Sequence, residues 1–224
     1  SYNTIEVNSQ ASQAAAGMSF QTNFGTAGTF NVFSNRILRL RTVNATAGAN
    51  NGVIGIDNQN VTPKVVNIYN NFITGFETAS TTTNSKLYGI RTSGTSTTRV
   101  YNNSIVIPDI TNFSAFGTSY IAGIVYASTS ETAIANGSID VKNNIVIVEE
   151  GTMKVWGLRR VGTTATFVSN YNNIFVVGGA ALGYVGYYNA SDAQTLANWQ
   201  TASTQDVNSK SKAVTFATAT DLHL

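Results

Sequence analysis

Side chains able to do acid–base or metal chemistry are few in this chain. General acid–base catalysis or a calcium site would need carboxylates that cluster. The eleven present are scattered: Glu6, Asp57, Glu77, Asp109, Glu131, Asp140, Glu149, Glu150, Asp192, Asp206 and Asp221. Glu149 and Glu150 are adjacent, so alternation along a strand would direct them to opposite faces. The single histidine, His223, has no identifiable serine and aspartate partners. We therefore expect no catalytic residue, no metal site and no cofactor.

One group of charged residues shares a position in a recurring segment. Asp57, Arg91 and Arg159 each lie two residues after a glycine, in VIGID, LYGIR and VWGLR. In one interpretation, Arg91 and Arg159 line a groove that binds the carboxylates of sugar acids. In the other, which we favour, the three residues lie on a solvated face and form loose ion pairs, each worth about 0–1 kcal/mol.

Aromatic side chains recur at a second position, directly before an asparagine-rich bend. The residues at this position are Phe33, Tyr69, Tyr101 and Tyr171, with Lys142 in one copy. Rings stacked one strand apart could bind sugars, which makes Tyr69 and Tyr101 candidate ligand-binding residues. The favoured alternative is that the rings stabilise the sheet by pairing across strands.

The composition excludes several classes of function. Charged residues are 11% of the chain and the net charge is +2, too small to indicate a nucleic-acid partner. No apolar run approaches the roughly 18 residues of a membrane span, so we expect no membrane insertion. There are no cysteines and only two prolines, which excludes disulfides and leaves strands rarely interrupted.

Two short sequence motifs alternate along the chain, and the elements that they form must position these side chains. The first surrounds an asparagine pair, as in IYNNFITGF (residues 68–76), and returns about every 29 to 41 residues. The second is an apolar stretch around a glycine; its glycines are Gly17, Gly55, Gly89, Gly123, Gly157 and Gly186. Such a period is typical of a solenoid.

Each repeat predicts a strand, a bend, a second strand, a variable loop and a third strand. Asparagine tolerates the left-handed backbone angles that the bend requires. Stacked repeats would form parallel sheets with coils about 4.8 Å apart. The expected architecture is all-β: a right-handed parallel β-helix solenoid of about five to six coils, with one short helix near the C-terminus. We expect one domain over residues 1–224, with coils over about 1–189, and we expect it to be a portion of a longer protein.

Alignment of the coils predicts a column of stacked amides at the bend. Its members are Asn35, Asn71, Asn103, Asn144 and Asn173. Amides can donate and accept along such a column, each bond contributing about 0.5–1.5 kcal/mol net. Two positions later an apolar column is expected inside the coils: Ile37, Ile73, Ile105, Val146 and Phe175.

The C-terminal residues predict a different kind of structure. Ser191, with Gln194 three residues later, indicates a capping box and a helix over about 191–202. Leu196 and Trp199 would share one face of that helix. Closing strands are expected over 203–224.

Apolar strands joined by stacked asparagine bends resemble right-handed parallel β-helix proteins of the pectate-lyase-like class. The tail, residues 196–224, is similar to the closing stretch of β-helix domains in secreted Bacteroidetes surface proteins. In those domains a Trp-bearing helix precedes a D-x-x-S turn, an aromatic strand and a D-L-H-L strand; Asp206, Ser209, Phe216 and residues 221–224 match these positions. The resemblance covers nearly the whole chain and implies a secreted or cell-surface location. It does not imply an activity, because this fold hosts many functions.

The expected function is that of a non-enzymatic structural or adhesive module of a large bacterial surface protein. Its partners would be surface glycans or neighbouring domains of the same chain. The alternative is a carbohydrate-active enzyme or carbohydrate-binding module that acts on acidic polysaccharide. Threonine-rich runs such as residues 81–83 also raise ice binding, but they fall in loops of unequal length, which disfavours the regular lattice that ice binding needs.

Overall fold

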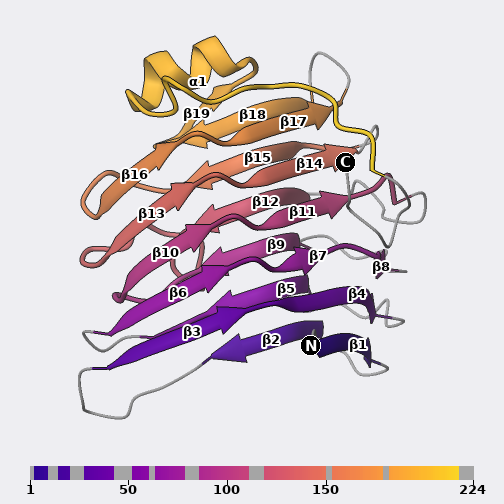
Figure 1. The fold of residues 1–224 in the computed structure, drawn as a ribbon. Coiled ribbons are helices and arrows are strands. Elements are labelled where there is room, and N and C mark those ends of the chain that lie inside the picture. Colours follow the sequence, from indigo (N-terminus) through magenta and orange to yellow (C-terminus); the bar gives the residue numbers. More distant parts are fainter. Residues whose placement is uncertain are drawn as a thin grey trace.

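The computed structural model describes residues 3–9, 15–20, 28–42, 52–60, 64–78, 86–110, 119–149, 153–178 and 182–216. Within them, strands β1 to β19 and the helix α1 form a stack of layers that ascends from the N-terminal end to α1 (Figure 1). Every paired strand is parallel to its neighbour except β19, which runs antiparallel to β18. The predicted all-β class is confirmed.

The strands form three sheets that successive segments visit in turn. The first sheet contains β1 (Asn3–Ser9), β4 (Asn35–Thr42), β7 (Phe72–Ile73), β8 (Phe76–Thr78), β11 (Ser104–Ile107), β14 (Ile145–Glu149) and β17 (Asn173–Val177). The second contains β2 (Ala15–Phe20), β5 (Gly52–Asn58), β9 (Lys86–Thr92), β12 (Tyr120–Tyr126), β15 (Val155–Arg160), β18 (Gly183–Tyr188) and β19 (Ser191–Ala193). The third contains β3 (Thr29–Phe33), β6 (Val65–Tyr69), β10 (Thr97–Tyr101), β13 (Ser138–Lys142) and β16 (Thr166–Asn170). Stacked passes through three parallel sheets are compatible with a β-helix-like solenoid.

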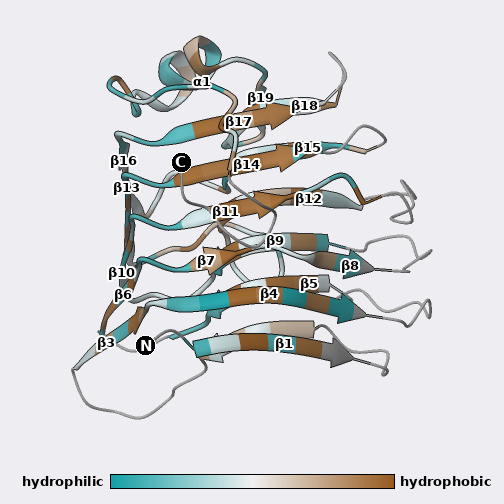
Figure 2. Ribbon diagram, turned by 45° about the vertical axis from the view of Figure 1, so that its right-hand side comes forward, coloured by the Kyte–Doolittle hydropathy of each residue, from teal (hydrophilic) through white to brown (hydrophobic). Residues whose placement is uncertain are grey.

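The core runs the length of the stack between the sheets. Hydrophobic stretches of β11, β14 and β17 lie one above another in Figure 2. The innermost column consists of side chains that are 0% exposed: Ile37, Ile73, Ile105, Val146 and Ile174. Phe175, predicted as the last member, is instead partly exposed, because Val146 pairs with Ile174. β-branched side chains suit this column because they are stiff and pack well on pleated surfaces.

The bend between the third and first sheets carries a column of stacked amides. Its buried members are Asn35, Asn71, Asn103, Asn144 and Asn172, and Asn3 extends it below. From one coil to the next, each Nδ2 donates to the Oδ1 above at 2.9–3.2 Å. The same Oδ1 accepts the backbone N–H of the asparagine below, from Asn35 upward. The column therefore ties neighbouring coils together through both side chain and backbone.

Asn173 was predicted as the fifth member of this column, and the structure places it one residue beyond. In the coils below, the residue before the ladder asparagine is Ser34, Asn70, Asn102 or Asn143, with φ of 54–56°. In the last coil Tyr171 takes this left-handed conformation, with φ of 59°. The prediction failed because it expected an asparagine there, and the bulkier tyrosine occupies the conformation that asparagine favours.

The helix is shorter than predicted. Residues 191–193 form β19, and α1 spans Leu196–Ser203 instead of 191–202. Thr195 is the N-cap, and its hydroxyl accepts the Asn198 backbone N–H, with the Asn198 side chain returning the contact. This capping box satisfies helix-end donors that the predicted Ser191–Gln194 pair does not reach.

Trp199 anchors α1 on top of the stack. Its side chain is 0% exposed and lies over Gly186, where an added Cβ would come within 2.1 Å of the indole. The glycine at position 186 therefore allows the Trp199 indole to approach the strand backbone closely. It pairs with Leu158 and is not in the column of Gly157, contrary to the sequence alignment.

Residues that follow α1 terminate the asparagine column. Asp206 Oδ1 accepts the last amide, Asn172 Nδ2, at 2.9 Å, and Asp206 Oδ2 accepts Trp199 Nε1 at 2.7 Å. Ser209 Oγ accepts the Asn172 backbone N–H, so it takes the role of the next ladder oxygen. Closing strands were predicted over 203–224. In the part of that range that the structure describes, up to residue 216, there is no strand after α1, and the pairing consists of one isolated bridge between Lys210 and Asn173. His223 and residues 221–224 lie outside the described residues.

Candidate functional site

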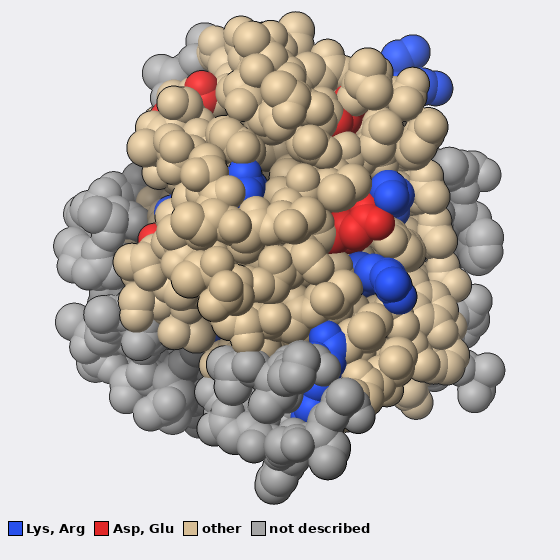
Figure 3. Space-filling model, turned by 90° about the vertical axis from the view of Figure 1, so that its left-hand side faces the viewer, with Lys and Arg blue, Asp and Glu red and all other residues tan. Residues whose placement is uncertain are grey.

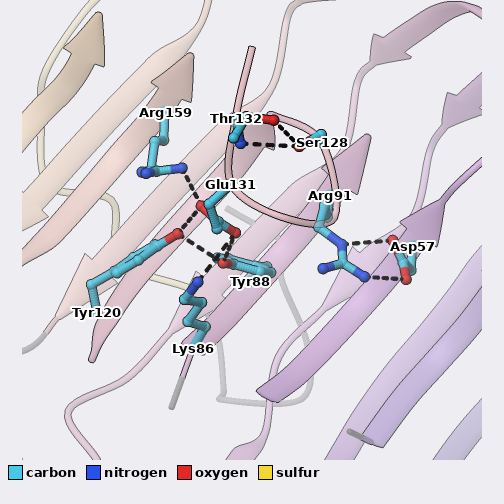
Figure 4. A network of polar contacts seen from close by, with 9 residues as sticks. All are labelled: Asp57, Lys86, Tyr88, Arg91, Tyr120, Ser128, Glu131, Thr132 and Arg159. Carbon is cyan, nitrogen blue, oxygen red and sulfur yellow. Dashed lines mark hydrogen bonds and ion pairs between the residues drawn. The ribbon is translucent and has the colours of Figure 1, made fainter. Parts of the chain in front are cut away.

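The outer surface of the second sheet carries a network of polar contacts (Figure 4). Residues three apart on a regular strand face opposite sides. In β5, however, Val53 and Ile56 both face the main core, while Ile54 belongs to a second, outer cluster. The alternation thus shifts at Gly55, and Asp57 comes to the outer face.

Asp57 and Arg91 form a close ion pair across neighbouring strands. Arg91 Nε donates to Asp57 Oδ1 at 2.9 Å and Nη2 donates to Oδ2 at 2.7 Å, a bidentate pair. The side chains are 4% and 13% exposed. Burial alone lowers the pKa of Arg91, but hydrogen bonding and attraction to Asp57 outweigh it and raise that pKa overall. The pair is more buried than the loose surface pairs that we expected.

Glu131 is the centre of a larger group of contacts. Its Oε1 accepts the Tyr88 hydroxyl at 2.5 Å and lies 3.7 Å from Lys86 Nζ. Its Oε2 accepts the Tyr120 hydroxyl and Arg159 Nη1, the latter at 2.5 Å. The two tyrosine hydroxyls are 2.9 Å apart. One carboxylate therefore receives donors from β9, β12 and β15.

Aromatic rings surround the Arg159 guanidinium. Its Cζ lies 4.7 Å from the Tyr120 ring centroid, 5.0 Å from that of Tyr187 and 5.4 Å from that of Trp156. Such rings attract a cation through their electron-rich faces. Arg159 is 8% exposed, so this attraction acts where little water screens it.

A loop between β12 and β13 delivers Glu131 to the sheet. Ser128 and Thr132 close its turn: Ser128 N–H donates to the Thr132 carbonyl, and Thr132 N–H donates to Ser128 Oγ. Glu131 has φ of 61°, a left-handed conformation that is uncommon for a residue other than glycine. Ile134 fixes the far side of the loop, since it is buried and its carbonyl accepts the Thr164 hydroxyl at 2.8 Å.

Burial controls the protonation of the groups around Glu131. It raises the pKa of Tyr88 well above 10, and the neighbouring Tyr120 and Glu131 raise it further. Burial likewise raises the pKa of Tyr120. Burial lowers the pKa of Lys86, and Glu131 offsets part of that effect. The phenols stay protonated at neutral pH, which makes the group an array of donors suited to holding a carboxylate.

A smaller group lies above it on the same sheet. Asp192 accepts Lys154 Nζ at 2.6 Å and Trp156 Nε1 at 2.8 Å. Lys154 Nζ is also 5.2 Å from the Tyr184 ring centroid. These contacts join β15 to β19 and support the end of the sheet.

The third sheet carries the predicted aromatic column on its outer face. The Phe33 and Tyr69 rings are stacked, with centroids 5.1 Å apart and planes 3° apart, and Phe33 is 49% exposed. Beside them, Asn67 Nδ2 donates to Asn31 Oδ1 at 2.8 Å. Tyr101 continues the register, and its hydroxyl donates to Asp140 Oδ2 at 2.5 Å. Tyr171 does not belong to the column, because Asn170 pairs with Lys142.

The predicted ligand-binding residues therefore lie on two different sheets. Arg91 and Arg159 occupy one column of the second sheet, with Val125 between them, and each already contacts a carboxylate of the protein. Tyr69 and Tyr101 lie on the third sheet. Their role in binding a ligand remains a prediction.

Sequence reasoning missed the donors around Glu131. Tyr88 and Trp156 precede their glycines at equivalent positions in LYG and VWG, so the repeat did contain a signal for an outer aromatic column. Glu131 comes from a variable loop, where the repeat provides no register. No pattern in the sequence could have assigned its partners.

Charged side chains are few on the side of the molecule in Figure 3, and several of them, basic and acidic, follow one another along the right half of the view. Among the described residues, no group of three or more His, Asp or Glu side chains could hold a metal ion. No helix in the described ranges has the length and apolar character to cross a membrane.

Comparison with known protein families, curated proteins and solved structures found no match to this chain.

Proposed function

We propose that this chain is a right-handed, pectate-lyase-like β-helix module with a non-enzymatic structural and adhesive role in a large secreted or cell-surface bacterial protein, of the Bacteroidetes type that its tail resembles. The observation that carries the structural part of the proposal is the asparagine column. It links every coil from Asn3 to Asn172 and ends on Asp206.

A stack held in this way resists bending and local opening. Neighbouring coils share strand hydrogen bonds in three sheets, and the buried amides add cross-coil bonds at the bend. Opening one coil would leave buried amide groups unpaired, at a cost of about 1–3 kcal/mol for each. A stiff module of this kind suits the spacing of neighbouring domains from a cell surface.

The adhesive part of the proposal rests on the outer face of the third sheet. The Phe33–Tyr69 stack is exposed and lies beside the Asn31–Asn67 amide pair. Aromatic rings with adjacent hydrogen-bonding groups suit contact with sugars, which have apolar ring faces and polar edges. Surface glycans are therefore the proposed partners.

The second candidate function is a module that recognises acidic polysaccharide. The observation that favours it is the set of cationic and phenolic donors on the second sheet. Acid–base chemistry has less support, because Asp57 and Glu131 are both engaged by arginines.

A glycan array with matched variants tests the adhesive role. Wild-type protein should bind a subset of glycans, and Tyr69→Ala should reduce that binding at least tenfold. Tyr171→Ala is the control, since Tyr171 is a 56% exposed tyrosine outside the stack. Equal effects of the two substitutions, or no glycan bound by the wild type, would exclude adhesion through this face and leave the structural role.

A further inference from the structure

The donors around Glu131 all come from the second sheet, whereas the acceptor comes from a loop. Tyr88 and Lys86 lie on β9, Tyr120 on β12 and Arg159 on β15. Figure 4 shows their polar ends pointing toward the Glu131 carboxylate. Strand pairing fixes Lys86 opposite Tyr120, so the spacing of these donors does not depend on the loop. The sheet by itself thus presents a preformed set of carboxylate donors.

Glu131 does not use all the hydrogen bonds that this set offers. Arg159 Nε is buried and has no hydrogen-bond partner among the described residues. Glu131 contacts the guanidinium at Nη1. Guanidinium groups bind carboxylates best through two parallel N–H donors. A carboxylate placed slightly differently could therefore engage Arg159 more completely than Glu131 does.

The charge of the surface also favours an anionic ligand. Without Glu131, the outer face would hold the cations Lys86, Arg91, Lys154 and Arg159 against the carboxylates of Asp57 and Asp192, and Asp192 is paired with Lys154. Asp57 is already committed to Arg91 by two hydrogen bonds. Lys86 and Arg159 would then be left as uncompensated, largely buried cations.

The turn of residues 128–133, which carries Glu131, can move away from the sheet without breaking a strand. Residues 129, 130, 132 and 133 of this turn are exposed, and its internal contacts are those of Ser128 with Glu131 and Thr132, while Ile134 beyond it is held in the core. The left-handed backbone of Glu131 is a conformation that residues other than glycine rarely adopt, and it disfavours the closed position. Closed and open positions of this turn can therefore exchange while Ile134 and the stacked coils stay in place.

We propose that Lys86, Tyr88, Tyr120 and Arg159 form a carboxylate-binding site that Glu131 fills in the closed state, and that the carboxylate of an acidic saccharide replaces Glu131. The saccharide class follows from the partly exposed Tyr184 and Tyr187, which flank Trp156 and Arg159 and offer rings to a sugar next to its carboxylate. The site lies on a different sheet from the Phe33–Tyr69 stack; the inference rests on the second candidate function, the recognition of acidic polysaccharide, and does not depend on the proposed adhesive role.

Removal of the internal carboxylate provides the test. We expect Glu131→Ala to bind glucuronate at least tenfold more tightly than the wild type, as measured by calorimetry and by a glucuronate-dependent rise in melting temperature. Methyl glucoside, which has no carboxylate, should have no effect on either protein. Glu131→Gln keeps the shape of the side chain and serves as the second variant if the alanine protein folds poorly.

Two controls separate binding from general stabilisation. Asp140 also accepts a tyrosine hydroxyl and a lysine, but on the third sheet and without an arginine held among rings. Asp140→Ala should therefore gain no affinity for glucuronate. Adding Tyr120→Phe to Glu131→Ala should lower the gained affinity several-fold.

Two results would overturn the inference. If Glu131→Ala and Glu131→Gln fold but bind glucuronate no better than the wild type, Glu131 is a structural clamp and the site does not exist. If acetate and acetyl-aspartate bind Glu131→Ala as tightly as glucuronate does, the site accepts any carboxylate and the saccharide class is wrong.

Discussion

Replacing Asn103 by alanine removes a central member of the asparagine column. The Asn103 side chain makes five hydrogen bonds. It accepts from the backbone N–H and Nδ2 of Asn71, and it donates to the carbonyls of Ile68 and Tyr101 and to Asn144 Oδ1. The side chain is buried, so water cannot replace these partners without opening the coil.

The expected loss of stability follows from the hydrogen bonds that each partner of Asn103 keeps in the variant. Asn71 Nδ2 still reaches the carbonyls of Val32 and Tyr69, and Asn144 Oδ1 still accepts the Asn103 backbone N–H. The Asn71 backbone N–H, in contrast, loses its side-chain acceptor. One buried unpaired donor costs about 1–3 kcal/mol, and each weakened bond costs about 0.5–1.5 kcal/mol more. We expect a loss of about 3 kcal/mol, or roughly 6–12 °C in melting temperature for a chain of this size.

Thermal and guanidinium unfolding followed by circular dichroism would measure this loss. Asn102→Gly is the matched control, because Asn102 is the adjacent exposed residue with φ of 54°, a conformation that glycine adopts freely. Its stability should change by less than about 1 kcal/mol. The reasoning is refuted if the two variants lose the same stability, since the buried amides would then contribute nothing that an exposed bend residue does not.

Three further predictions follow from close contacts, burial and capping. Gly123→Ala should cost about 2–3 kcal/mol, because the added Cβ would lie 2.2 Å from the Val146 side chain, whereas Gly28→Ala, with open space around it, should be neutral in the same unfolding assay. Burial raises the pKa of Tyr120, so the folded protein keeps a proton that the unfolded chain releases; stability is complete below pH 10 and falls above it. Between pH 10 and 11 the free energy of unfolding of the wild type should fall by up to about 1.4 kcal/mol more than that of Tyr120→Phe. If denaturant titrations give both proteins the same dependence of stability on pH, this prediction is contradicted. Asp206→Ala should remove the hydrogen-bond acceptor of Trp199 Nε1 and loosen the packing of α1. Tryptophan fluorescence should then shift to the red and be quenched more strongly, and an unchanged spectrum would show that Asp206 does not hold α1 on the stack.

The sequence predicted the asparagine column at Asn71 and Asn103 and the apolar column at Ile73 and Ile105, because a solenoid repeats its backbone geometry. Identical positions then share identical environments, and side-chain type reveals register. This logic failed in the last coil, where Tyr171 adopts a left-handed bend. A local preference for asparagine in that conformation was overridden by strand pairing between β14 and β17.

The candidate site was less predictable for a related reason. Asp57, Arg91 and Arg159 could be aligned because they lie on repeated strands. Their burial could not be anticipated, because it depends on neighbouring aromatic side chains and on a loop whose path the repeat does not determine. Glu131, the centre of the contacts, lies 43 residues from Tyr88 and 28 from Arg159.

Product analysis after incubation with polysaccharides tests the central claim of a non-enzymatic module most directly. Each polysaccharide that the protein retains on an array would be incubated with it and examined by mass spectrometry for shorter or unsaturated products. The account predicts that bound chains are recovered intact. Shortened chains, in a yield that falls with Asp57→Asn or Glu131→Gln, would contradict it and identify the second sheet as a catalytic surface.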